Sequence, residues 1–234
     1  MNAPPTPANR EHELTWQRLS DGSFLRTLRA DPPPGVRLRS DEELEATLSG
    51  TLREHERGTD LHVFGYGSLM WNPALDAADV RVARVPGWHR RFCLRSLFGR
   101  GTPETPGVML ALDRGGACRG LLFRIEAAKV DAEMRLLWRR EMIAGSYEAR
   151  WVYARVAGEP VRALTFVASR THDRYIADRA PEHVAKLILT GRGSLGSARA
   201  YFDSTQQALA RWGIDDPNIE RLRRAVLAAE SSAR

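Results

Sequence analysis

Short runs of β-branched and aromatic residues, separated by Gly and Pro clusters, fill the middle of this chain and constrain its fold more than any other feature. Such runs are typical of short strands. The expected strands cover residues 61–64, 80–85, 89–95, 108–112, 118–125, 150–156 and 162–167. One expected helix, residues 127–142, interrupts them without any regular alternation of strand and helix. This order predicts an α+β domain with a curved, mostly antiparallel sheet.

Both ends of the chain are predicted to be helical, apart from a polar tail. A helical piece is expected within residues 14–30, and Ser40 with Glu43 matches a capping box that would open a helix running to about residue 56. Three further helices are expected at residues 181–189, 195–212 and 218–229. Residues 1–12 are rich in Pro, Asn and Ala, which predicts disorder. We therefore expect an N-terminal extension over residues 1–60, made of a disordered tail and one or two helices, before the main domain over residues 61–234.

Cysteine usage and hydropathy indicate a cytoplasmic protein. A chain of 234 residues can bury a core without disulfides, and its two cysteines, Cys93 and Cys118, lie far apart in sequence. The first thirty residues hold no apolar stretch flanked by basic residues, so no secretory signal is expected. No stretch approaches the roughly 20 consecutive apolar residues that cross a bilayer, so no membrane partner is expected either.

The net charge of +6 could indicate a nucleic-acid partner. Only Lys129 and Lys186 are lysines, however, and the many arginines are scattered among Asp and Glu. No continuous basic stripe for following phosphates is visible. We therefore predict no nucleic-acid partner, and the sequence leaves the oligomeric state open.

A glycine-rich segment follows the first expected strand. Its residues are Gly65, Tyr66, Gly67, Ser68, Leu69 and Met70. Two glycines around one aromatic residue let the backbone turn sharply and approach a ligand, with several N–H groups pointing outward. Such a turn can bind a carboxylate or a developing oxyanion. The alternative is an ordinary tight turn with its tyrosine packed in the core.

Glu141 continues the apolar face of the helix expected over residues 127–142. Residues 130, 134, 137, 138 and 141 recur at spacings of three and four, which places them on one side. A carboxylate there is desolvated and lies near the negative end of the helix dipole, and both effects raise its pKa. This is the environment of a general base that works near neutral pH. The alternative is a structural ion pair with Arg140 or another arginine.

Other familiar site patterns fail on their context. The run Gly191–Gly196 matches G-x-G-x-x-G but follows an expected helix, not the strand that a dinucleotide loop requires, and we interpret it as a turn with Gly191 as a helix C-cap. The six histidines show no metal-ligand spacing, and two distant cysteines cannot form a zinc site. Ser68 lacks the G-x-S-x-G pattern of a nucleophile. We expect no metal and no cofactor.

Taken together, these residues resemble the ChaC-like γ-glutamylcyclotransferases, in order from Val63 to about Trp212. The family's motifs V-F-G-Y-G-S-L, G-x-x-R-x-F, R-G-T-P-x-x-P-G and R-E-x-x-x-G-x-Y match residues 63–69, 87–92, 100–107 and 140–147. The resemblance implies a mixed, mostly antiparallel β-barrel with flanking helices. It also implies that residues 61–234 form the catalytic domain and that residues 1–60 have no counterpart in compact members. Ala198 departs from the family pattern, which often has asparagine at this position.

The family's reaction would need no cofactor. The α-amino group of a γ-glutamyl substrate, such as glutathione, attacks its own γ-carbonyl, forming 5-oxoproline and releasing an amine. The resemblance makes Glu141 the catalytic acid/base and residues 65–70 the holder of the γ-glutamyl group. Arg100, Tyr147 and Tyr175 are further candidates for the substrate pocket. Two alternatives stay open: a cyclotransferase for another γ-glutamyl amine or peptide, and a non-catalytic γ-glutamyl-binding module.

Overall fold

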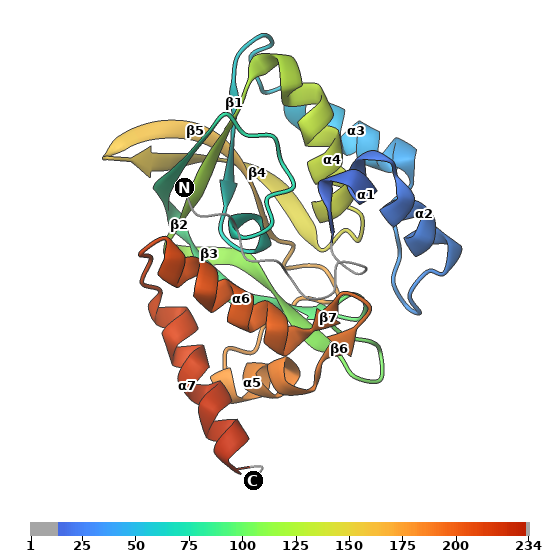
Figure 1. The fold of residues 1–234 in the computed structure, drawn as a ribbon, viewed down its shortest axis with the longest axis vertical. Helices are drawn as coiled ribbons and strands as arrows, with labels where there is room; N and C mark the ends of the chain where they lie inside the picture. The colour runs from blue at the N-terminus through green and yellow to red at the C-terminus, as the bar shows by residue number, and fades with distance from the viewer. Residues whose placement is uncertain (1–13, 233–234) are drawn as a thin grey trace.

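A closed five-stranded barrel forms the centre of the molecule in the computed structural model, which describes residues 14–232 (Figure 1). The strands are β1 (Leu61–Gly65), β2 (Asp79–Ser96), β3 (Gly107–Ile125), β4 (Tyr147–Val156) and β5 (Glu159–Ala168). Their order is β1-β3-β2-β4-β5, and β5 closes the barrel through parallel pairs with β1 and β3. All other pairs are antiparallel. The predicted α+β class and the mixed, mostly antiparallel barrel are confirmed.

The strands β2 and β3 are each one long strand, where the sequence predicted two short ones. Pro86 and Gly87 stand at a register shift in β2, opposite Gly115 and Gly116 of β3. The three glycines have positive φ values of 80°, 104° and 66°, which glycine adopts without steric cost. Both strands therefore bend at the same level without ending. Gly and Pro mark a bend here and not a loop.

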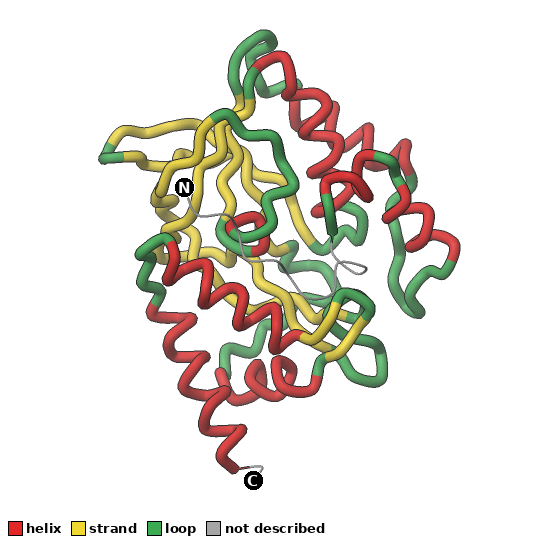
Figure 2. Tube along the Cα trace, viewed as in Figure 1, coloured by secondary structure: helices red, strands yellow, loops and turns green. Residues whose placement is uncertain are grey.

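Helices cover the barrel in two groups (Figures 1 and 2). The first group contains α1 (Trp16–Ser20), α2 (Ser23–Ala30), α3 (Asp41–Leu52) and α4 (Val130–Glu141). The second contains α5 (Pro181–Thr190), α6 (Ala198–Arg211) and α7 (Pro217–Ser232). Short 3-10 turns, η2 (Ser68–Met70) and η3 (Ala127–Lys129), follow β1 and precede α4. Among the described residues, no helix is long and apolar enough to span a membrane.

The N-terminal helices differ from the sequence prediction in two details. The piece expected within residues 14–30 is two helices, because Gly22 adopts a left-handed conformation between them. The capping box of Ser40 and Glu43 is present, but its helix ends at Leu52 and not near residue 56. The predicted disorder of residues 1–12 lies outside the described residues. The division of the chain at residue 60 stays a prediction.

The C-terminal helices lie close to the predicted positions, and the segment between α5 and α6 corrects one interpretation. It forms a small ladder of β6 (Arg192–Gly193) and β7 (Gly196–Ser197), so α6 begins at Ala198 and not at residue 195. Gly191 follows α5 with φ −63°, which is not the left-handed conformation of a glycine cap. A Cβ on Gly191 would lie 2.3 Å from the Cα of Gly107. Close backbone packing is what excludes a side chain there.

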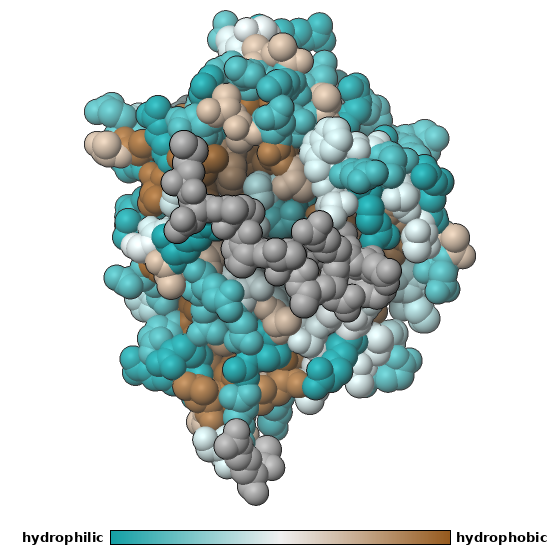
Figure 3. Space-filling view, viewed as in Figure 1, coloured by the Kyte–Doolittle hydropathy of each residue, from teal (hydrophilic) through white to brown (hydrophobic). Residues whose placement is uncertain are grey.

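Buried hydrophobic residues form one core that runs from the barrel to both helix groups. It includes Leu19 and Leu48 of the N-terminal helices, Phe64 and Leu112 of the barrel, and Phe202 of α6. The face seen in Figure 3 is mostly hydrophilic, with hydrophobic side chains visible over the barrel strands and around α5 and α7. Because Leu19 and Leu48 belong to the same buried cluster as the barrel residues, the N-terminal helices pack on the same core as the barrel.

Candidate active site

The glycine-rich segment leaves the end of β1 and turns at once into η2. A Cβ on Gly65 would lie 2.8 Å from the ring of Phe123, and one on Gly67 would lie 3.2 Å from Leu110. Close packing therefore excludes a side chain at Gly65, whereas at Gly67 it would require the Leu110 side chain to shift. The N–H of Met70 donates to the carbonyl of Gly67 (2.8 Å). The sequence predicted that the N–H groups of this segment point outward, but the N–H of Met70 is therefore not available to a ligand. Among the described residues, none accepts a hydrogen bond from the N–H groups of residues 67–69.

Arg90 of β2 anchors this segment from beneath. Its guanidinium is fully buried, and Nε donates to the carbonyl of Tyr66 (2.6 Å). The same guanidinium donates to the carbonyl of Arg119 and pairs with Asp216, just before α7. The hydroxyl of Tyr66 donates to the carbonyl of Phe166 (2.6 Å). Hydrogen bonds thus hold Tyr66 both at its backbone carbonyl and at its side-chain hydroxyl.

Glu141 is the last residue of α4 and lies on the predicted apolar face. Val130, Met134, Leu137 and Trp138 are buried, and the Glu141 side chain is 14% exposed. Its Oε1 lies 2.9 Å from Nε of Arg140. The ion pair between Glu141 and Arg140, which the sequence offered as an alternative to a catalytic role, is therefore present. The burial that raises the pKa of a general base is present as well.

Arg140 also connects Glu141 to the glycine segment. Its Nη2 donates to Oγ of Ser68 (2.8 Å), and its Nη1 donates to the carbonyl of Asn72 (2.7 Å). These bonds hold the end of α4 against η2, so the carboxylate and the free N–H groups of the turn lie in one place. The sequence placed both in one site, and the contacts of Arg140 supply the connection.

The electrostatics of this site are dominated by burial. Burial raises the pKa of Glu141, and the charge and hydrogen bond of Arg140 act in the opposite direction. Burial and, next, the Glu141 carboxylate raise the pKa of Tyr66 and of Tyr201, the latter to about 12. Burial and neighbouring phenols do the same for Tyr147, with a smaller contribution from Glu141. All three tyrosines therefore stay protonated beside a carboxylate.

Tyr147 and Tyr201 line the site from opposite directions. The hydroxyl of Tyr147, on β4, donates to the carbonyl of Leu110 (2.7 Å). Tyr201, on α6, packs edge-on against Trp71 and Phe92, at centroid distances of 5.4 and 5.9 Å. Its hydroxyl would be 3.5 Å from a Cβ on Gly67, which places it against the glycine segment.

Tyr201 was not among the predicted site residues. The signal was available, because Tyr201 is the tyrosine that ends the family's G-x-x-G-x-N-x-x-Y pattern in residues 193–201. Arg100, a predicted pocket residue, lies over the Tyr201 ring at 5.5 Å and so belongs to the same neighbourhood. Ala198, at the asparagine position of that pattern, is fully buried as the first residue of α6.

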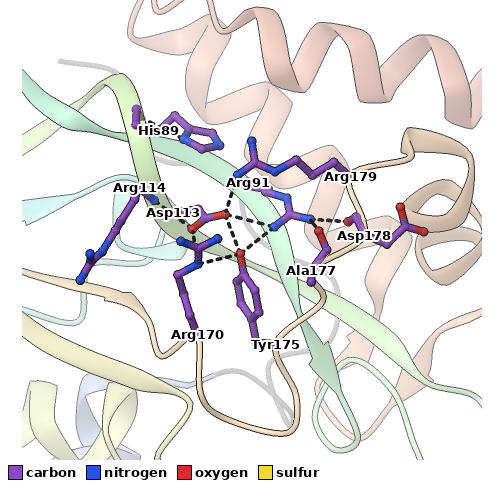
Figure 4. Close-up of polar contacts among 10 residues, drawn as sticks. His89, Arg91, Asp113, Arg114, Arg170, Tyr175, Ala177, Asp178 and Arg179 are labelled. Carbon is purple, nitrogen blue, oxygen red and sulfur yellow. Dashed lines mark hydrogen bonds and ion pairs between the residues drawn. The ribbon is translucent and has the colours of Figure 1, made fainter.

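Tyr175 lies in a different group of side chains. Its hydroxyl donates to Asp113 (2.9 Å) and accepts from Arg91 and Arg170, both at 3.2 Å (Figure 4). The recorded contacts connect Tyr175 to this group and not to Glu141. Its role in substrate binding, inferred from the family resemblance alone, stays untested.

Comparisons with known proteins show the family of this chain. A family model described as "ChaC-like protein" matches residues 61–229. The chain belongs to the ChaC-like family. It is 39% identical to the glutathione-specific γ-glutamylcyclotransferase of Escherichia coli (strain K12) over 186 residues, which cover 79% of this chain and 80% of that protein. It is 34% identical to the human glutathione-specific γ-glutamylcyclotransferase 1, over 60% of this chain and 66% of that protein.

Solved structures support the ChaC-like fold. A crystal structure of the yeast γ-glutamyl cyclotransferase specific to glutathione superimposes with a TM-score of 0.66, over 73% of this chain and 96% of that chain. The identity between the two is 19%, so the likeness concerns the fold alone. Within residues 14–232, no three His, Cys, Asp or Glu side chains are placed so that they could hold a metal ion.

Proposed function

We propose that this ChaC-like protein is a γ-glutamylcyclotransferase that converts glutathione to 5-oxoproline and cysteinylglycine. The observation that carries the proposal is the arrangement of Glu141, a buried carboxylate with a raised pKa, joined through Arg140 to a turn with free N–H groups. The names of the E. coli and human relatives support glutathione as the substrate.

The reaction uses the substrate's own amine as the nucleophile. Glu141 accepts a proton from the α-ammonium group, and the freed amine attacks the γ-carbonyl carbon. A new C–N bond closes the five-membered ring, and the carbonyl oxygen becomes an oxyanion. As this intermediate collapses, the γ-glutamyl amide bond breaks and Glu141 returns a proton to the departing nitrogen. The ring nitrogen, which still carries two protons after the attack, releases one of them to solvent and becomes the lactam N–H of 5-oxoproline. No nucleophile from the protein is needed, because catalysis comes from positioning and proton transfer.

The turn after β1 has the geometry to hold the γ-glutamyl part. The N–H groups of Gly67, Ser68 and Leu69 can bind the α-carboxylate or stabilise the oxyanion. Tyr201 is a protonated phenol beside Glu141 and can donate to the substrate. Tyr66 and Tyr147 also stay protonated, but their hydroxyls already donate to the carbonyls of Phe166 and Leu110, so they shape the pocket. Met70 shapes the turn through its backbone bond to Gly67 and through its buried side chain. Tyr175 is retained as a pocket residue on the family resemblance alone.

The deciding experiment incubates the purified protein with glutathione and measures 5-oxoproline and cysteinylglycine in equal amounts. Formation of both products supports the proposal. Product from other γ-glutamyl amines, without product from glutathione, would move the specificity to another leaving group. Tight binding of glutathione without any 5-oxoproline would instead identify a non-catalytic γ-glutamyl-binding module.

A cytoplasmic location without nucleic-acid partners fits this function. Cys93 and Cys118 are free, buried thiols, as expected in a reducing compartment. The arginines of the described residues engage in many scattered pairs, among them those of Arg29, Arg124 and Arg199. Such dispersed pairs do not form a continuous basic track for a phosphate backbone.

A further inference from the structure

A cavity separate from the Glu141 site lies between β2, α5 and α7. It has a volume of about 140 Å³. Its floor is apolar and consists of Phe92, Val184, Ile219 and Leu222, all buried. The polar side chains around it include His89, Arg179 and Arg221, and its lining contains no carboxylate.

The positive charge beside this cavity exceeds the negative charge that compensates it. Asp113 has no exposed side-chain surface, and three guanidiniums surround it: Arg91 at 3.1 Å, Arg170 at 3.5 Å and Arg179 at 3.8 Å (Figure 4). One carboxylate therefore serves three cations. Arg179 is the farthest of the three, and its side chain is 63% exposed. Arg221 has no carboxylate within 4.0 Å among the described residues.

Two carboxylates close in sequence to the lining residues, Asp178 and Asp216, are already engaged by other groups. Asp178 accepts from the N–H of Ala180 and pairs with His183. Asp216 pairs with the buried Arg90 and accepts from two N–H groups at the start of α7. Neither has a free side to compensate Arg179 or Arg221. The excess of positive charge is thus a feature of the cavity and not of one side chain.

The start of α5 also suits an anion. The Nδ1 of His89, another lining residue, donates to the carbonyl of Gly115 (3.0 Å) and is therefore not available to a ligand. The helix α5 begins at this cavity with Pro181 and has no side-chain cap on its first N–H groups. A helix N-terminus favours negative charge, and Glu182 in the first turn of α5 already supplies part of it.

We propose that this cavity binds a small phosphomonoester whose organic group is apolar. The arginines around the cavity outnumber their one shared carboxylate, and a phosphate dianion can accept hydrogen bonds from the guanidiniums of Arg179 and Arg221. The apolar floor then covers a ring or short alkyl group of the ester. The cavity is distinct from the Glu141 site, although Arg90 and Phe92 of its lining also contact Tyr66 and Tyr201.

The test is isothermal titration calorimetry on the full chain at fixed ionic strength, with inorganic phosphate, phenyl phosphate and benzoate as probes. Phenyl phosphate is expected to bind at least tenfold more tightly than benzoate, which has the ring but only one charge. It is also expected to bind more tightly than phosphate, which cannot use the apolar floor. Equal affinities for phenyl phosphate and benzoate would overturn the proposal.

Paired variants locate the binding. The double variant Arg179→Gln with Arg221→Gln is expected to lose at least tenfold in affinity for phenyl phosphate. The matched control is Arg84→Gln with Arg211→Gln, which removes two exposed arginines outside the cavity and should bind normally. Equal losses in both double variants would show attraction to the overall charge and would overturn the site. The single variant Arg221→Gln, at an exposed position, gives the same answer if the double variant folds poorly.

A last arm separates this site from the proposed active site. In Glu141→Gln, which cannot turn over its substrate under the proposed mechanism, saturating glutathione should leave phenyl phosphate binding unchanged. Complete competition would place the phosphate in the glutathione pocket and overturn the proposal. Because this arm reads binding and not activity, its result does not depend on whether the cyclotransferase assignment succeeds.

Discussion

Nε of Arg140 lies 2.9 Å from Oε1 of Glu141, although the two residues are adjacent at the end of α4. The pair puts a fixed positive charge beside a carboxylate whose burial raises its pKa. The two effects oppose each other, so Arg140 limits how far the pKa of Glu141 rises. Since Arg140 also holds Ser68 and Asn72, one side chain sets both the position of the base and its proton affinity.

Glu141→Gln should abolish turnover and keep the fold. The amide has nearly the same shape as the carboxylate but cannot accept a proton, and general acid–base catalysis contributes roughly 10²–10⁴-fold to a rate. We expect kcat for 5-oxoproline formation to fall by about that factor, with an unchanged circular dichroism spectrum. Turnover within a few-fold of the parent protein would show that another group moves the protons.

The pH dependence of kcat/KM should have an acid limb set by Glu141. The base form is lost as the pH falls through the pKa of Glu141, which burial holds above the usual 4.5. In Arg140→Gln this limb should move to higher pH, because the neighbouring charge that favours the carboxylate is gone. Ser68→Ala is the control, since it removes a partner of Arg140 but no charge, and its limb should stay in place.

The same raised pKa predicts a pH-dependent difference in stability. Between the usual pKa of a glutamate and the raised value in the folded state, the folded protein holds a proton that the unfolded chain has released. Stability from this group is thus greatest at low pH and falls as the pH rises through that window. Glu141→Gln lacks this loss, so its Tm relative to the parent should increase across the window and then level off. A difference that is independent of pH would contradict the raised pKa.

Local patterns predicted much of this fold. The capping box of Ser40 and the apolar face that ends at Glu141 each depend on residues three or four apart, so their geometry is set within one helix. The residues around Pro86 and Gly87 do not show from sequence alone whether they form a bend within one strand or a loop between two strands. Its continuity depends on pairing with β3, which lies far along the chain.

The candidate site was predicted in part, for a similar reason. Glu141 and the turn at residues 65–70 have local signals, namely a helix face and two glycines. Tyr201 reaches the turn only because α6 packs on the barrel through Phe92, a contact between distant segments. The hydroxyl of Tyr175 is taken up by Asp113, which no spacing in the sequence indicates. Contacts of this kind depend on tertiary packing.

Arg90→Met should destabilise the protein strongly. The substitution removes the hydrogen bonds to the carbonyls of Tyr66 and Arg119 and leaves Asp216, which is 9% exposed, without its ion-pair partner. Breaking a buried ion pair from one side costs about 3–5 kcal/mol. Urea unfolding should show a loss of that size. Arg84→Met, at an exposed position on the same strand, is the control and should change stability by no more than about 0.5 kcal/mol.

Two glycine-to-alanine substitutions should have opposite effects, because one glycine is required by packing and the other is not. A Cβ on Gly191 would lie 2.3 Å from the Cα of Gly107 and 3.0 Å from the carbonyl oxygen of Arg100, and backbone atoms cannot move aside as a flexible side chain can. Gly50 lies within α3, and its Cβ would meet only the guanidinium of Arg53, at 3.6 Å.

Gly50→Ala should therefore stabilise the protein by about 0.5–1 kcal/mol through helix propensity, measured by urea unfolding. Gly191→Ala should destabilise it by about 1–3 kcal/mol, the usual cost of overpacking. It should also lower kcat/KM for glutathione, because the segment that it displaces carries Arg100, which lies over the Tyr201 ring beside Glu141. Normal stability of Gly191→Ala would mean that the two backbone segments can separate without cost, contrary to the packing described above.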